Sequence, residues 1–476
     1  MRKMFSTAIA SLRPIHESSL RWTTGMGTDE GSLKMPTLPI ETCEEILSYL
    51  QGDFKTLAAC SLACRAWLPV TRSYVFGEVL LQRDEECEHF RVILDESPTV
   101  GLHVRILSVK DANDHAGNIA QQESSWVWLL LRLNNLEVLN VVESDLDLSG
   151  PIQDVINTRH PVLPIKRFRM ARVAFRNNEL QILLSSCPLL THLAMHHSSP
   201  WNEIEFSDVA PLWRVAARKW FSNNAAIPIT VPCRPIEPNE RVPIQTLIWE
   251  PIRPLNWQVI TNFRNGDQWN LRLRRLSVSC RDFDTTMTPG LRNLLEQSAE
   301  TLEELHMNVF SGLRPGIPTP NHPFLIGATK LKAIYIRAPL LLSNPSCHSW
   351  DGLLDVLSDI RPSHSQLEKL SISMSPTKVI LDWDQVGQHL TRIMHVLPQM
   401  VVTLLVVPER LSGPGHGDVS AFVDRLLDGL HRSATGGRLA LMWFGSHEAF
   451  MEYGGLENVL PPWFRVQSSL SDNIWW

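Results

Sequence analysis

The stretch "LRRLSV", residues 273–278, has apolar residues at its first, fourth and sixth positions. The same L-x-x-L-x-V pattern recurs in "IQTLIW" (244–249), "LEELHM" (302–307) and "LKAIYI" (331–336). The four hexapeptides start at 244, 273, 302 and 331, so successive starts are 29 residues apart. Such even spacing indicates that one supersecondary unit is repeated along the chain.

Looser copies of the hexapeptide extend the repeat in both directions. Upstream they are "VRILSV" (104), "LEVLNV" (136), "IKRFRM" (165) and "LTHLAM" (190), and downstream "LEKLSI" (367) and "VVTLLV" (401). The 54 residues between the starts at 190 and 244 are nearly two periods. We expect either a degenerate repeat or a loop in that gap.

A helical pattern precedes several of the hexapeptides, as "LRNLLEQSAE" precedes "TLEELHM" and "NELQILLSSCP" precedes "LLTHLAM". Each unit therefore reads as a helix, a short loop and a strand. Neither element can bury its apolar face alone, so neighbouring units must stack into a parallel sheet with helices along one side. A doubly wound parallel sheet is the alternative, because it also alternates helix and strand.

The repeated unit resembles that of a leucine-rich-repeat solenoid of the long, helix-containing type. The Asn or Cys that a regular repeat carries after its strand is missing, so the resemblance is to the irregular repeats of that class. The predicted fold class is α/β, with the array at residues 83–460 and a C-terminal tail at 461–476.

A different pattern occupies the N-terminal part, "LPIETCEEILSYLQGDFKTLAACSLACRAWLPVTRSYVF" from residue 38 to 76. Pro39 suits the first turn of one helix, Gly52 and Asp53 break the chain before a second, and Pro69 opens a third. Three helices this short bury too little surface to be stable alone. An apolar face left exposed on them would mark a docking site.

The order Leu38-Pro39-x-Glu41, amphipathic helix, polar break and Cys60-Ser-x-x-Cys64-Arg-x-Trp67 closely resembles the F-box, over residues 36–82. This resemblance implies docking on the Skp-type adaptor of a cullin-RING ubiquitin ligase, and through it on the cullin. It divides one set of residues between the motif's own packing and the adaptor surface. That set is Leu38, Pro39, Ile46, Leu47, Leu50, Leu57 and Trp67.

Composition narrows the class of protein further. The 476 residues carry a net charge of −6, with 44% hydrophobic and 20% charged residues, which indicates an ordinary soluble protein and no nucleic-acid partner. No run reaches the ~20 apolar residues of a membrane span. The eight cysteines contain no C-x-x-C pair, so reduced thiols in the cytoplasm or nucleus are expected.

Residues 1–34 are predicted to be a disordered tail. Their Arg2, Lys3, Arg13 and Arg21 lie among Ser and Thr with no acid before Glu17, which weakly imitates a mitochondrial presequence. The tail is expected to be dispensable for folding.

Three local patterns could suggest chemistry. Gly413 and Gly415 precede a helical pattern, but Asp418 at its start would repel a phosphate. A metal site at Cys60 and Cys64 would need further ligands nearby, and adjacent histidines such as His196 and His197 point to opposite faces of a strand. No enzyme activity, cofactor or metal is therefore expected.

In each L-x-x-L-x-V unit the fourth and sixth positions should point into the core, so the third, fifth and seventh should lie on the opposite, concave face, because side chains alternate along a strand. On that surface the Lys and Arg side chains outnumber the acidic ones, which are chiefly Glu250 and Glu304. This charge is either the solvated face of the strands or a site for an acidic or phosphorylated protein segment. The candidate substrate-binding residues are Arg167, Arg169, Arg275, Tyr335, Arg337 and Lys369, with His192 and His196 beside them.

The sequence thus predicts a non-catalytic substrate receptor of an SCF-type ubiquitin ligase. The alternative is a stand-alone protein-interaction scaffold.

Overall fold

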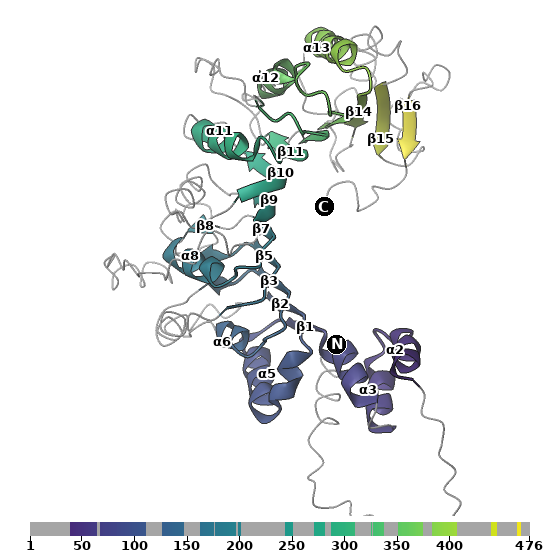
Figure 1. Cartoon of the computed structure of the whole chain (residues 1–476), viewed down its shortest axis with the longest axis vertical. Coiled ribbons are helices and arrows are strands. Elements are labelled where there is room, and N and C mark those ends of the chain that lie inside the picture. The colour runs from purple at the N-terminus through teal and green to yellow at the C-terminus, as the bar shows by residue number, and fades with distance from the viewer. Residues whose placement is uncertain are drawn as a thin grey trace, which may run out of the picture.

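The computed structural model describes residues 39–63, 67–110, 126–146, 162–175, 177–196, 199–200, 243–250, 271–280, 287–309, 325, 327–337, 351–374, 383–406, 439–444 and 464–467. Within these ranges a group of three short helices is followed by a long, curved parallel sheet (Figure 1).

The three N-terminal helices are α2 (Ile40–Ser48), α3 (Phe54–Ala63) and α4 (Leu68–Phe76). Gly52 separates the first two with a φ of 93°, a left-handed conformation that glycine adopts without steric cost. The side chain of Asp53 accepts hydrogen bonds from the backbone N–H and the hydroxyl of Thr56 at the start of α3. The predicted breaks at Gly52, Asp53 and Pro69 are confirmed.

Thirteen strands of the described chain form one sheet, and their spatial order is their order in the sequence. They are β1 (Glu78–Leu81), β2 (Ile106–Lys110), β3 (Val138–Val142), β5 (Arg167–Ala171), β7 (His192–His196), β9 (Ile244–Glu250), β10 (Leu271–Cys280), β11 (Glu304–Val309), β12 (Ala333–Arg337), β13 (Lys369–Met374), β14 (Val401–Val406), β15 (Leu439–Phe444) and β16 (Phe464–Gln467). Every neighbouring pair is parallel. A doubly wound sheet reverses its strand order at a switch point, so this sequential order contradicts that alternative.

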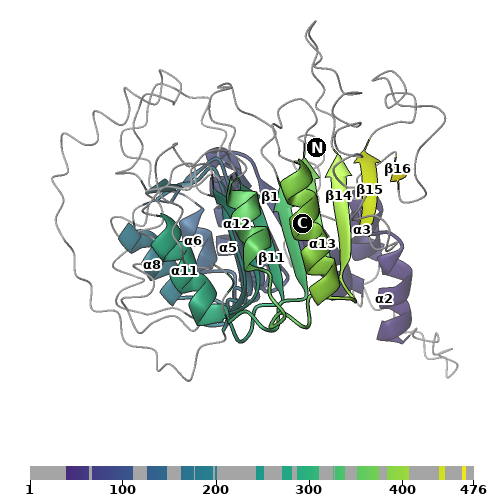
Figure 2. The same cartoon turned by 90° about the horizontal axis from the view of Figure 1, so that it is seen from above.

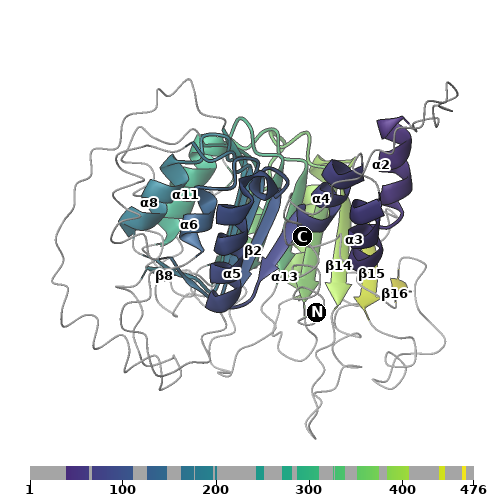
Figure 3. The same ribbon diagram turned by 90° about the horizontal axis from the view of Figure 1, so that it is seen from below.

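The helices lie along the outer side of the curved sheet, which leaves its concave face to the strands. They are α5 (Asp84–Glu96), the 3-10 helix η2 (Pro98–Leu102), α6 (Val127–Leu130), α8 (Asn177–Ser185), α11 (Met287–Ser298), α12 (Asp351–Asp359) and α13 (Trp383–Val396). Figure 2 shows α12 and α13 in front of the strands, and Figure 3 shows α5 over the β1–β2 end. The predicted parallel sheet with helices on one side is confirmed.

The register follows the repeat, because equivalent positions of successive units face each other. Leu276 pairs with Leu305, which pairs with Ile334, and all three are buried. Their neighbours Ser277 and His306 alternate to the other face. The apolar first, fourth and sixth positions form one continuous core from Phe76 to Leu439.

Short second strands continue three of the units, and the sequence analysis missed them. β4 (Asp145–Leu146), β6 (Ala174–Phe175) and β8 (Ser199–Pro200) pair in parallel as a separate small sheet. Buried Ser144 and Val173 stand where a regular repeat carries Asn. The missing Asn concealed this part of the unit.

Several predicted boundaries are corrected by the strand pairing. Residues 78–81, assigned to the F-box range, form the first strand of the sheet, and residues 464–467, assigned to a tail, pair with β15 as its last strand. β15 supplies an edge whose backbone groups need partners, which the alternating "FRVQ" can satisfy.

Two further expectations are settled by register. β7 and β9 are direct neighbours, so no strand of this sheet lies between them and the gap is an insertion rather than a repeat. Val402 pairs with Leu370, so Val402 rather than Leu404 takes the fourth position of the last predicted unit, and the predicted start at residue 401 is corrected.

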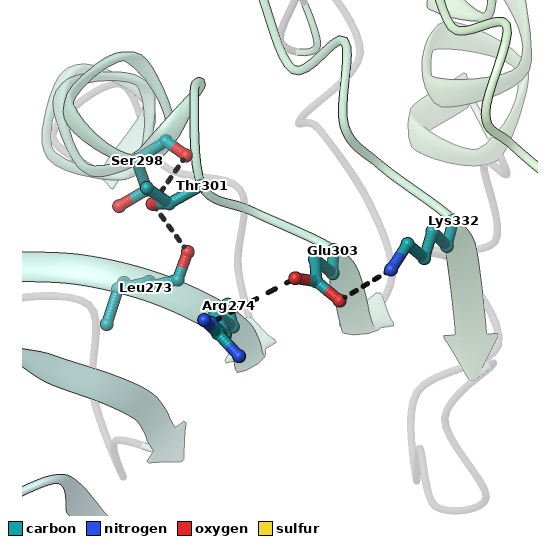
Figure 4. A network of polar contacts seen from close by, with 6 residues as sticks. All are labelled: Leu273, Arg274, Ser298, Thr301, Glu303 and Lys332. Atoms are coloured by element: carbon teal, nitrogen blue, oxygen red, sulfur yellow. Dashed lines mark hydrogen bonds and ion pairs between the residues drawn. The ribbon is translucent and has the colours of Figure 1, made fainter.

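The loops that enter the strands are tied to one another by polar side chains. The hydroxyl of Thr301 donates to the carbonyl of Leu273 at 2.9 Å, and Glu303 bridges Arg274 and Lys332 of the flanking units (Figure 4). Asn135, Thr191 and Gln399 make corresponding bonds to the preceding unit's backbone. Such links satisfy backbone carbonyls of the loops and connect each unit to the preceding one.

None of the helices that the structure describes combines the length and the apolar character required to cross a membrane.

Candidate functional site

The three-helix group has a small core of its own. Leu47, Leu57 and Val70 form it, one from each helix, and Trp67 packs against them. The indole N–H of Trp67 donates to the buried Cys43 sulfur at 3.1 Å. Cys60 is partly buried against this core, whereas Cys64 lies outside the described residues.

Large apolar side chains remain exposed on the same three helices. Ile46 is 41% exposed, Tyr49 79%, Phe54 37% and Leu62 61%. Ile46 and Tyr49 are three residues apart at the end of α2, so they lie on one side of it. A concentration of exposed apolar residues on so small a unit is typical of a docking surface.

The predicted adaptor-binding residues differ in their burial. Leu47 and Leu57 are fully buried, so they can support a docking surface but cannot contact a partner. Ile46 and Pro39 are exposed. The remaining three are Leu50 and Trp67, which are partly buried against the core, and Leu38, which lies outside the described residues.

Tyr49, Phe54 and Leu62 are the surface residues that sequence reasoning missed. Each sits next to a polar residue in the sequence. The i, i+3 spacing of Ile46 and Tyr49 was the available signal.

The three-helix group joins the sheet without a linker. Val75 of α4 contacts both the small core and the large one, and Phe76 belongs to the large core. The carbonyl of Gly77 accepts hydrogen bonds from the backbone N–H groups of Arg105 and Ile106 at the start of β2. A Cβ at Gly77 would collide with the carbonyl of Ser73 in α4, so glycine is favoured at the end of this helix.

A connected polar cluster crosses four adjacent strands of the concave face. The guanidinium Nε of Arg275 donates to Glu304 Oε2 at 2.6 Å, and His306 Nε2 lies 3.7 Å from the same oxygen. The His306 ring stacks on Tyr335 with centroids 4.3 Å apart, and Lys369 Nζ lies 5.1 Å from the Tyr335 centroid. Three of the predicted substrate-binding residues, Arg275, Tyr335 and Lys369, thus belong to one cluster.

Burial and neighbouring charges set the ionisation of this cluster. Burial raises the pKa of Glu304, but the hydrogen bond and positive charge of Arg275 outweigh it and hold that pKa below its usual value. Burial is also the main reason that the pKa of His306 falls to about 4, with Glu304 acting in the opposite direction. At neutral pH the Arg275–Glu304 pair is charged and internally compensated, and His306 is neutral.

The other predicted face residues are placed as follows. Arg167 and Arg169 are exposed on β5, and Arg337 is partly buried on β12. His192 is partly buried, and its pKa is lowered by burial and then by the charges of Arg167 and Arg275. His196, at the end of β7, alternates to the same face as His192 but is buried.

Cationic side chains at the strand ends and in the entry loops have ion-pair partners, whereas several on the concave face have none among the described residues. Lys110 and Arg172 both pair with Glu143, at 3.2 and 2.6 Å, and Lys166 pairs with Glu137. Among the described residues, Arg167, Arg169 and Arg337 have no ion-pair partner, and the side chain of Glu250 falls outside that part of the chain. The concave face therefore presents uncompensated positive charge.

No group of three or more His, Cys, Asp or Glu side chains that could hold a metal occurs within the described ranges. Among the described residues, Cys43, Cys60, Cys87 and Cys187 form no disulfide, and burial raises the pKa of Cys187 far above its usual value. The loop at Gly413–Asp418 and the residue His197 lie outside the described residues.

Comparison with known proteins identifies the N-terminal helices. The sequence model of the F-box-like family matches residues 35–74, which include α2, α3 and most of α4. No curated protein matches the chain. Residues 35–74 are therefore an F-box-like domain, and the parallel array that follows it begins at the strand next to the match.

Proposed function

We propose that this protein is a non-catalytic substrate receptor of an SCF-type ubiquitin ligase, located in the cytoplasm or nucleus. Its F-box-like domain docks on a Skp-type adaptor, and through it on a cullin. The array, a leucine-rich-repeat-like solenoid, holds a protein substrate on its concave face. The observation that carries the proposal is the exposed apolar surface of a domain with an F-box-like match.

The free energy of burying the exposed apolar side chains supports docking on an adaptor. Fully burying a large apolar side chain contributes about 1.5–3 kcal/mol, so covering four of them supports a specific complex. The domain's own core consists of three buried residues, so a partner that covers the remaining surface would stabilise it as well.

The complex would act by holding the bound substrate close to the ubiquitin-conjugating enzyme. A rigid junction at Val75 and Gly77 fixes the array relative to the F-box-like domain, so a bound substrate is held at a defined distance from the conjugating enzyme. Tethering converts a bimolecular encounter into a local one and raises the effective concentration of a target lysine.

The test is co-purification with a recombinant Skp-type adaptor. Changing Ile46 and Tyr49 together to Asp should weaken adaptor binding at least tenfold and leave the far-ultraviolet circular dichroism unchanged. The matched control changes Val92 and Leu102 to Asp, since these side chains are also exposed but lie on α5 and η2 of the array.

Equal adaptor binding by both double variants would contradict docking through the F-box-like surface. Failure of the unmodified protein to bind any Skp-type adaptor would favour the alternative, a scaffold without a ligase role.

A further inference from the structure

The concave face carries one unbroken row of paired positions from β5 to β13. In order, the row runs through Arg167, His192, Thr246, Arg275, Glu304, Ala333 and Lys369. Six steps between strands spaced ~4.8 Å apart give a length of roughly 29 Å along the sheet, and the concave curvature shortens it.

Charge is distributed unevenly along this row. At the β5 end, Arg167 is exposed, and Arg169 lies two residues further along the same strand and face. At the other end, Lys369 lies over the Tyr335 ring, and Arg337 extends from the strand that carries Tyr335. Both ends are therefore positive.

The middle of the row carries no net charge. The Arg275 guanidinium is neutralised by Glu304 at 2.6 Å, and His306 beside it is neutral because burial lowers its pKa to about 4. His192 is likewise shifted toward its neutral form. A carboxylate placed here would meet Glu304 and gain little from Arg275.

The surroundings of the β5 end also favour an extended ligand. On the strands that flank β5, the positions facing Arg167 and Arg169 are Val138, Asn140, His192 and Ala194, without a carboxylate. Arg167 and Arg169 are both exposed beside these residues. Arginine forks hold carboxylates through paired hydrogen bonds.

We infer that the concave face binds an extended peptide segment with two acidic clusters separated by an uncharged centre of about six residues. Arg167 and Arg169 hold one cluster, and Lys369 and Arg337 hold the other. The uncharged centre passes over the Arg275–Glu304 pair and the His306–Tyr335 stack. At ~3.4 Å per residue, eight to nine residues cover the row.

This inference rests on the proposed function, because it names the substrate class of the receptor, but its test does not involve the adaptor. Fluorescence anisotropy with the full-length protein at physiological salt compares three labelled peptides of equal length. One has two acidic pairs flanking six uncharged residues, one has all four acids together, and one has the acids replaced by their amides. The separated arrangement should bind at least tenfold more tightly than the other two.

The site is then tested with two charge-matched double variants. Arg167→Gln with Arg169→Gln should abolish the preference for the separated peptide. Lys166→Gln with Arg172→Gln removes the same charge from the same region, but from side chains that already pair with glutamates, and should preserve it. Equal effects of the two double variants would show non-specific attraction and overturn the inference.

A gain of function provides the second test. Glu304→Gln frees Arg275, so a peptide with an additional acid at its centre should bind at least threefold better to the variant than to the unmodified protein. No improvement would contradict the role given to the neutral centre. Binding only when a single phosphoserine replaces the acids would mean a localised phosphate site and would likewise overturn the two-cluster arrangement. Adaptor binding by all these variants should be unchanged, which separates failure here from failure of the proposed function.

Discussion

The F-box-like domain and the parallel array differ in how they bury their apolar side chains. The domain closes three helices around Leu47, Leu57 and Val70 and leaves Tyr49 and Leu62 in solvent. The array stacks unit upon unit into one core. A small element with little core of its own depends on a partner, whereas a stacked element supplies its own neighbours.

The two regions nevertheless meet in a shared helix. α4 contributes Val70 to the small core and Phe76 to the large one, with Val75 in contact with both. The domain therefore has a stabilised end at the array and an exposed end at α2. The exposed apolar side chains Ile46 and Tyr49 lie at that exposed end.

The largest effect is expected from a substitution that creates a cavity in the core of the array. Leu305→Ala removes a fully buried side chain from the middle of the stack and should cost about 3–5 kcal/mol, measured by urea unfolding. The loss should appear in one transition, because each unit supports its neighbours. Lys332→Ala, on an exposed side chain of the adjacent unit, should stay within ~0.5 kcal/mol. A second, separate transition would show that the units do not form one cooperative core.

The equivalent cavity in the F-box-like domain should act locally. Leu57→Ala should cost about 2–4 kcal/mol in the domain and abolish adaptor binding, while the main urea transition of the array stays in place. Amide hydrogen exchange would locate the change, with α2 and α3 exchanging faster and β5 to β13 unaffected. Equal acceleration in the array would mean that the two regions are one cooperative unit.

The smallest expected effect is a pH dependence of stability that belongs to the array and not to the F-box-like domain. His306 has a folded-state pKa of about 4 against 6.5 for an unperturbed histidine, so the unfolded chain binds the proton more readily between these values. Its contribution to stability is present above pH ~6.5 and is lost as the pH falls toward 4, by on the order of 2 kcal/mol. His306→Gln should flatten the array's stability in that window, followed by thermal unfolding at each pH. An unchanged slope would assign the acid sensitivity to other groups.

Sequence alone was sufficient for periodic features. The 29-residue spacing around Leu276 and Leu305 predicted the parallel pairing and the buried positions, and Gly52 and Pro69 marked helix boundaries that the structure has. These signals are local, because each depends on a residue's own backbone preference or on its spacing from the next copy. The F-box-like domain was accessible for the same reason, since its motif is contiguous.

Irregular features could not be read in this way. The short strands at Leu146 and Phe175 lack the usual Asn, and β16 has no repeat motif, so pairing with an existing edge determines both. Whether Leu47 or Ile46 faces a partner also depended on which side of α2 the other helices cover. The residues of a helix that face its own core and those that face a partner are both apolar. Only the packing of the other helices shows which of them are buried and which are exposed.

The concave face shows the same division most clearly. Strand alternation in the sequence determined that Arg167, Arg275 and Lys369 share one surface. Only the tertiary structure decided that Arg275 is neutralised by Glu304 while Arg167 is not. These partners lie on neighbouring strands 29 residues apart in the chain, and a Coulomb interaction depends on their separation in space, which the register of the sheet alone establishes.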